Sequence, residues 1–271
     1  MRQVRQWLSA AVCAVALVAP TSSALAAPDA APGGVYWNGD FGNGAGFSQW
    51  HHVHDGAENP INGRTSAQLV STPGSSGNSS VSLVARGGTG TSSDRAEVGN
   101  DPSTNRGFEG QESYYHFSVY FPSSNKGNWA PKVWDHNNFF QFIGTDWAKP
   151  VMNMGIDTGD FGTDSPHMYF NFNVSANGDI DDHKGGRWDL GEVRYESWTD
   201  FVVHVRWSKD TSGLLQAWMN GNEVVPLRGA RTLGNAPVIM EIQNYRPATG
   251  GSTTAHLFDA IRIGDSFGAV Q

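Results

Sequence analysis

The chain has 271 residues, with 26 acidic and 18 basic side chains and a formal net charge of −8. An acidic protein gains little counterion-release affinity for nucleic acid, and no stripe of Lys and Arg is present, so we expect no nucleic-acid partner. The single cysteine, Cys13, lies near the N-terminus, which excludes an internal disulfide and a metal site of several thiolates.

Residues 1–26 have the pattern of a secretory signal peptide. A positively charged start precedes a short apolar stretch, and Ala24-Leu25-Ala26 has the small-x-small form of a cleavage site. The apolar stretch is too short to cross a bilayer, which takes roughly 20 residues. We therefore expect a secreted, extracellular protein with no membrane partner. Residues 27–34 form a Pro/Ala/Gly linker, and residues 35–271 fit one large domain.

Period-two alternation of apolar and polar residues runs through this domain, and helical periodicity is nearly absent. Strands are predicted at residues 66–71, 80–85, 95–98, 112–121, 139–143, 151–156, 167–174, 201–207, 214–219, 223–225, 238–245 and 255–264. Asn220-Gly221 predicts a hairpin with a type I′ turn. With 33 glycines and 13 prolines as punctuation, the pattern predicts an all-β fold, a two-sheet antiparallel β-sandwich of jelly-roll type.

Several strands place Tyr, His, Asn and Gln opposite their apolar face. In the strand at 112–121 this polar face carries His116, and in the strand at 167–174 it carries Asn171 and Asn173. A face exposed only to water normally has more Lys, Glu and Thr, whereas sugars combine hydroxyls with apolar ring faces. We therefore predict a carbohydrate-binding groove in which His116, Asn171 and Asn173 contact sugar.

Arg95 and Glu97 lie two residues apart in a predicted strand and therefore share one face. On a solvated face such an ion pair contributes only about 0–1 kcal/mol. Inside a groove, Glu97 would instead orient the Arg95 guanidinium so that it receives a substrate carboxylate. The spacing alone leaves both interpretations open.

Four segments resemble the polysaccharide lyases with a concanavalin A-like jelly roll, the group that contains glucuronan, alginate and heparin lyases. They occur in the family's order and together cover most of the domain. They are Gly39-Asp40-Phe41 with Phe47-Ser48-Gln49-Trp50, Arg95-Ala96-Glu97-Val98, Trp198 to Trp207 with the Asn220-Gly221 hairpin, and Ile239 to Arg246 with Phe258 to Gly264. The resemblance implies a lyase that cleaves a uronic-acid-containing polysaccharide by β-elimination. We expect a monomer whose partner is this anionic polysaccharide.

The resemblance also assigns roles to individual side chains. In β-elimination a base removes the C5 proton, an acid protonates the oxygen leaving C4, and a polar group neutralises the adjacent carboxylate. The tyrosine of the family's closing motif aligns with Tyr245, which is the implied acid. Arg95 and Gln141 are the implied carboxylate neutralisers, with Glu97 orienting Arg95.

The general base stays open at this point. Where the family has the histidine of a Gln-x-His motif, this chain has Gln141-Phe142-Ile143. Another histidine could supply the base, because imidazole is suitable near neutral pH. His52 and His54 follow the opening segment of the family pattern, and of these two we favour His54. Tyr245 acting alone as acid and base would favour syn elimination. Weaker alternatives for the base are His116 and His136.

A second departure concerns the closing motif, where the family has a lysine and this chain has Glu241. Arg246 is the residue that could restore the lost positive charge as a substrate contact, although in a regular strand it points away from Tyr245. The resemblance also allows a structural Ca²⁺ between the two ends of the domain, with Asp40 and Asp259 as its carboxylates. We expect no other cofactor.

The two departures favour an alternative function, a non-catalytic carbohydrate-binding sandwich with the same groove. A laminarinase-like hydrolase on this architecture is a third possibility. It would need paired carboxylates about 5–5.5 Å apart, and the sequence has no Glu-x-Asp-x-x-Glu run that would supply them.

Overall fold

A computed structural model describes residues 33–42, 46–54, 65–74, 78–86, 93–129, 137–159, 161–162, 165–181, 183–247 and 252–271. The predicted signal peptide, most of the predicted linker and His136 lie outside these described residues. Within the described part of the chain, no helix has the length and apolar character needed to cross a membrane.

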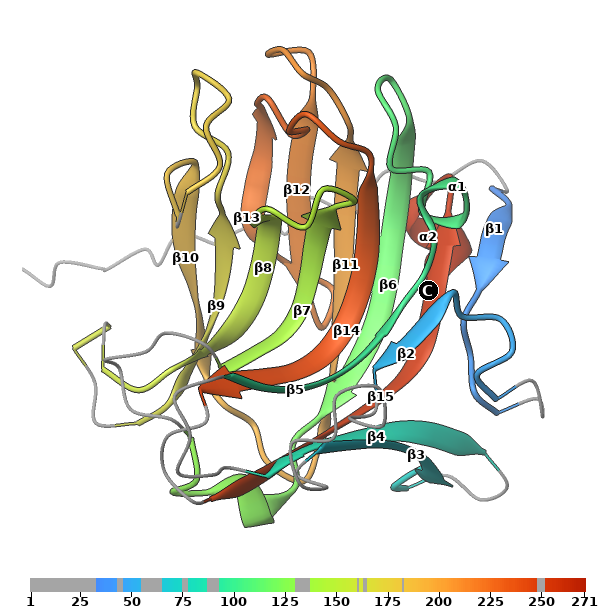
Figure 1. The fold of residues 1–271 in the computed structure, drawn as a ribbon, viewed down its shortest axis with the longest axis vertical. Helices are drawn as coiled ribbons and strands as arrows, with labels where there is room; N and C mark the ends of the chain where they lie inside the picture. Colours follow the sequence, from blue (N-terminus) through green and yellow to red (C-terminus); the bar gives the residue numbers. More distant parts are fainter. Residues whose placement is uncertain are drawn as a thin grey trace, which may run out of the picture.

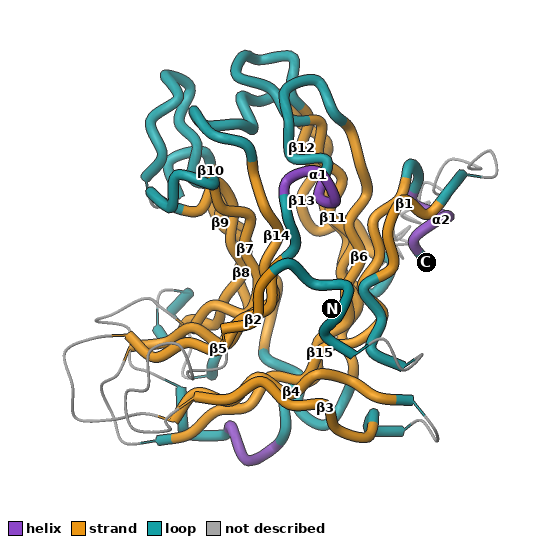
Figure 2. The backbone as a smooth tube through the Cα atoms, turned by 45° about the vertical axis from the view of Figure 1, so that its right-hand side comes forward, coloured by secondary structure: helices purple, strands orange, loops and turns teal. Residues whose placement is uncertain are grey.

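The domain consists of two antiparallel sheets packed face to face (Figures 1 and 2). The back sheet has eight strands, in the spatial order β13 (Asn222–Gly229), β12 (Leu214–Met219), β11 (Trp198–Arg206), β6 (Glu112–Tyr120), β15 (Thr253–Gly264), β4 (Ser79–Arg86) and β3 (Thr65–Ser71), with β1 (Val35–Asn38) paired to β15. The front sheet has seven, in the order β10 (Gly186–Glu192), β9 (His167–Phe172), β8 (Pro150–Asp157), β7 (Asn137–Gly144), β14 (Val238–Pro247), β5 (Ser93–Gly99) and β2 (His52–His54). Three short helices, α1 (Pro102–Asn105), η1 (Ser123–Asn125) and α2 (Phe267–Val270), complete the described elements.

The core between the sheets is built from the apolar faces of their strands. Phe117 of the back sheet stacks on Phe140 of the front sheet, with 4.3 Å between ring centroids, and on Phe201 of the neighbouring strand at 5.2 Å. All three rings are buried. Aromatic rings that interlock across the interface fix how the two sheets sit on each other, because the interior is close-packed.

The predicted β-sandwich is confirmed, and each predicted strand is present with its ends moved by a few residues. Asn220 and Gly221 have φ values of 50° and 76°, the two positive values that a type I′ turn needs. Strands β1, β2 and β10 were not predicted. Among the described strands, each pairs with only one neighbour. Such a strand can form without the regular alternation of apolar and polar residues that was used to predict the others.

Strand β14 positions the site, because it lies inside the front sheet between β7 and β5. Met240 and Ile242 point into the core, so Glu241 and Tyr245 point to the opposite, outward face. We call this outward face of the front sheet the groove face. Strands β5, β14, β7 and β8 bend visibly along their length, as Figure 1 shows.

Candidate active site

Strand register aligns polar side chains in a row across the groove face. Glu241 of β14 lies opposite Gln141 of β7, and Gln141 lies opposite Asn153 of β8. Asn153 is in turn opposite Asn171 of β9, which is opposite Arg187 of β10. Neighbouring strands are about 4.8 Å apart, so the row offers a chain-like ligand successive polar contacts across five strands.

A second row runs parallel to the first. Arg95 of β5 lies opposite Tyr245 of β14, and Tyr245 lies opposite Asn138 of β7. Asn138 is opposite Gly155 of β8, which is opposite Tyr169 of β9. The row therefore brings the predicted acid Tyr245 and the predicted neutraliser Arg95 onto adjacent strands.

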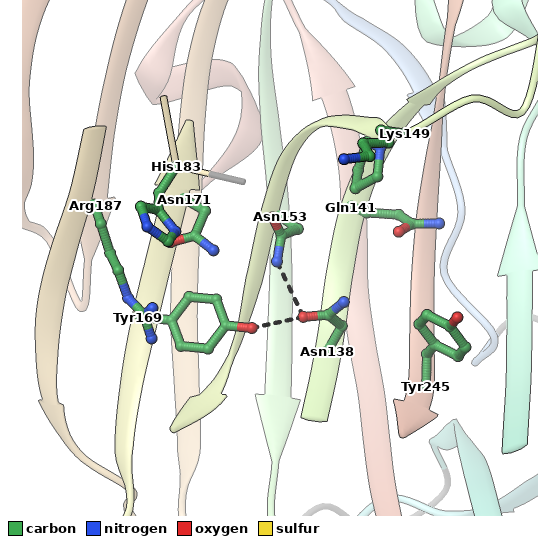
Figure 3. Close-up of a pocket in the computed structure, with 10 residues that line it drawn as sticks. Asn138, Gln141, Lys149, Asn153, Tyr169, Asn171, His183, Arg187 and Tyr245 are labelled. Carbon is green, nitrogen blue, oxygen red and sulfur yellow. Dashed lines mark hydrogen bonds between the residues drawn. The ribbon is translucent and has the colours of Figure 1, made fainter. Parts of the chain in front are cut away.

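A pocket of about 210 Å³ lies between these rows (Figure 3). Its lining is made of amides, phenols and basic side chains, and none of the ten residues carries a carboxylate. They are Asn138, Gln141, Lys149, Pro150, Asn153, Tyr169, Asn171, His183, Arg187 and Tyr245. A lining with hydrogen-bond donors and basic groups but without carboxylates suits an anionic ligand.

Asn138 is held by two hydrogen bonds to its side-chain oxygen. Its Oδ1 accepts a hydrogen bond from the Tyr169 hydroxyl at 2.8 Å and another from Asn153 Nδ2 at 3.0 Å (Figure 3). Asn138 is only 5% exposed. Two donors on one carbonyl oxygen fix which end of the amide faces them, because an amide nitrogen cannot accept.

The far wall of the pocket is formed by a stacked basic side chain. The Arg187 guanidinium lies 4.5 Å from the centroid of the Tyr169 ring and pairs with the buried carboxylate of Asp157. Lys149, at the edge of the pocket, forms an exposed ion pair of 2.7 Å with Asp181. Stacking and ion pairing hold Arg187 in place more firmly than Lys149, whose exposed pair contributes little.

Next to the pocket, two carboxylates and an imidazole gather around β14. His52 Nε2 lies 3.0 Å from Glu241 Oε1, and Gln141 Nε2 donates to the other oxygen of Glu241. The Arg95 guanidinium lies 3.6 Å from Glu97, which is buried whereas Arg95 is half-exposed. Ligand atoms of His52, Glu97 and Glu241 lie within 4.8 Å of one another.

This crowding changes the protonation of both Glu97 and His52. Burial, and next the carboxylate of Glu241, raise the pKa of Glu97 to about 7, against the opposing effect of Arg95. Burial alone would lower the pKa of His52, but Glu241 outweighs it and the net shift is upward. The cluster therefore holds protons at a pH where isolated carboxylates have lost them.

The raised pKa of Glu97 gives a pH-dependent stability. Between its ordinary pKa of 4.5 and the folded value of about 7, folded protein binds a proton that unfolded protein has released, so stability falls as pH rises through this window. We expect Glu97→Gln to raise the free energy of unfolding by roughly 3 kcal/mol at pH 8, at about 1.4 kcal/mol per pKa unit, and to change it little at pH 4.5. Urea unfolding at both pH values measures this, and an equal effect at both would contradict the assignment.

Residues 39–262 match the family model described as polysaccharide lyase. The chain belongs to the polysaccharide lyase family. The match spans both sheets and every strand of the two polar rows, so the groove face described above belongs to a lyase. No curated protein matches the chain.

Solved structures show how the fold of this lyase is shared. An endo-β-1,4-glucuronan lyase from the fungus Trichoderma reesei is similar with a TM-score of 0.60 and 18% identity, over 82% of this chain and 93% of that one. Alginate lyase Aly36B has a TM-score of 0.50 and 13% identity, over 87% and 96%. A carbohydrate esterase from Shiga toxin-encoding bacteriophage phi24B has 0.50 and 12%, over 86% and 98%. These likenesses concern the fold alone.

Several residues predicted for the lyase site lie on the groove face. Tyr245, Gln141 and Asn171 line the pocket, and Arg95 and Glu97 form the predicted pair beside it. The ion pair of Arg95 with Glu97 is therefore neither on the back sheet nor in the core. Gln141 differs from expectation in one respect, since its amide donates to Glu241.

Three predicted substrate contacts are elsewhere. Arg246 is wrong as a groove residue: it points between the sheets, is 1% exposed and donates to Ser252 and Thr254. The prediction for His116 is also wrong. Alternation correctly places His116 on the outward face of β6, but β6 belongs to the back sheet, and there the Nδ1 atom of His116 lies 2.5 Å from the Ala260 carbonyl.

Asn173 is on the groove side but outside the pocket lining. Its Nδ2 donates to Asn153 Oδ1 at 2.9 Å and to the Pro150 carbonyl at 2.9 Å, while its Oδ1 accepts from the His183 backbone at 2.7 Å. Asn173 therefore holds other groove residues in place, and its predicted role as a sugar contact is wrong for this geometry.

Asp40 and Asp259, from opposite ends of the domain, are brought together, as the predicted metal pair requires. Burial and the neighbouring Asp40 raise the pKa of Asp259 to about 6. Asp259 also accepts from the Thr72 hydroxyl at 3.2 Å and from the backbone of Ala260 at 2.8 Å. Adjacent carboxylate oxygens are the donors that hard cations such as Ca²⁺ prefer.

Sequence reasoning predicted three of the ten lining residues, Tyr245, Gln141 and Asn171. Asn138, Asn153 and Arg187 were not predicted, nor were Lys149 and His183. Tyr169 was placed on the polar face but given no role. The alternation of β9, which correctly put Asn171 on the groove face, contained the information for Tyr169. The remaining residues follow from register and loop geometry, which one sequence does not reveal.

Proposed function

We propose that this lyase cleaves a uronate-containing polysaccharide by β-elimination. The observation that carries the proposal is the pocket itself, where Tyr245 lies among amide donors and basic groups with no carboxylate in the lining. A uronate carboxylate would meet donors there, and β-elimination needs no paired carboxylates. The fold is shared with proteins named as glucuronan and alginate lyases.

Proton transfer in this proposal belongs to Tyr245. It lines the pocket, whereas His52 is engaged by Glu241 and neither His52 nor His54 is part of the lining. His54 lies two strands from Tyr245 and two residues along, opposite Glu97. Strand spacings of about 4.8 Å and rises of about 3.3 Å separate their backbones by roughly 12 Å. His54→Gln should therefore retain most of the turnover, and a loss as large as that of Tyr245→Phe would make His54 the base.

A single phenol that removes the C5 proton and then protonates the C4 oxygen must work on one face of the sugar. In β-D-glucuronate and β-D-mannuronate the C5 hydrogen and the C4 oxygen lie on the same face of the ring. In α-L-guluronate and α-D-galacturonate they lie on opposite faces. The proposal therefore favours glucuronan and polymannuronate as substrates.

A substrate panel tests the proposal. The mature protein is incubated with glucuronan, polymannuronate, polyguluronate and polygalacturonate, and the ultraviolet absorbance of the C4–C5 double bond is followed. We expect activity on glucuronan or polymannuronate. Activity confined to polyguluronate or polygalacturonate would overturn the single-tyrosine mechanism, and silence on all four would overturn the uronate proposal.

Export is proposed from the N-terminal pattern. Residues 1–26 would be removed after Ala26, so that the mature enzyme meets its polymer outside the cell. The intact mass of protein recovered from culture medium tests this, and a retained Met1 would contradict it.

A structural Ca²⁺ at Asp40 and Asp259 is proposed on the donor set described above. Its expected effect is on stability, because an ion that binds only the folded state stabilises it by mass action. We expect millimolar Ca²⁺ to raise the thermal midpoint of the wild type, and Asp259→Asn to abolish this increase. An equal increase in both proteins would place the ion elsewhere.

A further inference from the structure

Three asparagines form a chain of hydrogen bonds that crosses the groove face, which we call the amide chain. Asn173 Nδ2 donates to Asn153 Oδ1 at 2.9 Å, and Asn153 Nδ2 donates to Asn138 Oδ1 at 3.0 Å. The chain starts at the loop of His183, whose backbone N–H donates to Asn173 Oδ1 at 2.7 Å. All three side chains are at least nine-tenths buried.

The amide chain has a fixed direction. Each carbonyl oxygen receives a donor from the preceding residue, so each NH₂ group points toward the next. At the end of the chain, Asn138 Oδ1 is held by both Asn153 and the Tyr169 hydroxyl. Its Nδ2 is therefore the group that faces the pocket, and it has no hydrogen-bond partner among the described residues (Figure 3).

The backbone beside Asn138 leaves room for this arrangement. A Cβ atom at Gly155 would lie 2.3 Å from the Tyr169 hydroxyl and 2.7 Å from Asn138 Oδ1. Any residue larger than glycine would therefore displace the hydrogen bond that orients the Asn138 amide. The absence of a side chain at this position is part of how the pocket is built.

Two other donors near Tyr245 already interact with carboxylates of the protein. Gln141 Nε2 donates to Glu241, and the Arg95 guanidinium is paired with Glu97. Asn138, directly opposite Tyr245 on the adjacent strand, differs because no protein carboxylate is among its partners. A buried donor aimed into a pocket stabilises negative charge that develops there, since it needs no reorganisation.

We propose that Asn138 Nδ2 binds the carboxylate of the sugar from which Tyr245 removes the C5 proton, and that Asn153, Tyr169 and Asn173 position it. This inference rests on the proposed function. As the C5–H bond breaks, its electrons move into the carboxylate to form an enolate. They then form the C4–C5 double bond as the C4–O bond breaks and the leaving oxygen takes a proton. Asn138 stabilises the enolate stage.

The test compares a carboxylate substrate with its neutral form. Asn138→Asp keeps the oxygen that accepts from Tyr169 and Asn153 but replaces the NH₂ with a second oxygen, which repels a substrate carboxylate. On glucuronan or polymannuronate, whichever the wild type cleaves, we expect kcat/KM to fall about 100-fold or more. On the methyl ester of the same polymer, the loss should be about tenfold or less. Asn222→Asp, at an exposed position of the back sheet, is the matched control and should leave both rates unchanged.

The outcomes separate this inference from the proposed function. Wild-type protein that cleaves none of the four polymers of the substrate panel contradicts the proposed function, and activity confined to polyguluronate or polygalacturonate contradicts its single-tyrosine mechanism. Wild-type activity with equal losses on acid and ester in Asn138→Asp, or with no loss, overturns the inference, because a merely structural role does not distinguish the two substrates.

A second variant tests the positioning of Asn138 with little change in packing. Tyr169→Phe removes one of the two donors on Asn138 Oδ1 and keeps the ring under Arg187. We expect the ratio of kcat/KM on acid to that on ester to fall roughly fivefold, the effect of one neutral hydrogen bond. An unchanged ratio would mean that Tyr169 does not position the amide.

Discussion

Tyr245→Phe is expected to lower kcat by about 1,000-fold or more while KM changes only a few-fold. The phenol in this account both removes the C5 proton and protonates the leaving oxygen, and each general acid or base contributes about 10²–10⁴-fold. The ring itself remains, so sugar contacts and packing are kept. The measurement is the rate of ultraviolet absorbance increase at saturating polymer, alongside thermal unfolding to show that the variant is folded.

The matched control for this variant is Tyr114→Phe. Tyr114 lies on the back sheet, where its ring stacks on His204 at 4.1 Å, so removing its hydroxyl should leave turnover unchanged. If Tyr245→Phe were as active as Tyr114→Phe, the assignment of proton transfer to Tyr245 would be wrong.

Arg246→Ala is expected to reduce the free energy of unfolding by about 3–5 kcal/mol. The guanidinium is buried between the sheets, donates to Ser252 and Thr254, and lies opposite Asp94 on β5. Its removal leaves a cavity and takes a positive charge from beside a buried carboxylate, which raises the cost of burying Asp94. Urea denaturation measures the change.

A comparison of KM values decides whether Arg246 also binds substrate. Because it points away from the groove face, the folded fraction of Arg246→Ala should keep the wild-type KM. Arg194→Ala, at an exposed position, should change stability by no more than about 0.5 kcal/mol. A raised KM with unchanged stability would return Arg246 to the substrate-binding residues.

The fold could be predicted because its physical causes are local. Alternation of apolar and polar residues marks strands wherever one face is buried, and Asn220-Gly221 specifies its own turn. The assignment of strands to sheets is not local. His116 shows this: its place on the outward face of β6 was predicted, but pairing with β11 and β15 puts that face on the back sheet.

The site could be predicted only in part, for a similar reason. Tyr245 and Gln141 came from motifs, but Asn138 lies three residues before Gln141, and simple alternation would put them on opposite faces. An irregularity in the pairing of β7 with β8, between Asn138 and Phe140, changes this. The extra residue leaves Phe139 and Phe140 both buried, so Asn138 and Gln141 share the pocket. Such a bulge depends on the neighbouring strand and is not visible in one sequence.

The central claim is cleavage by elimination at Tyr245. Its most direct test is to run the reaction in water labelled with ¹⁸O and to measure the masses of the products by mass spectrometry. Elimination breaks the C4–O bond without water, so the account predicts an unsaturated sugar at the new non-reducing end and no labelled oxygen in either fragment at the moment of cleavage. Hydrolysis would place a labelled oxygen in one fragment and produce no double bond, and that result would contradict the account.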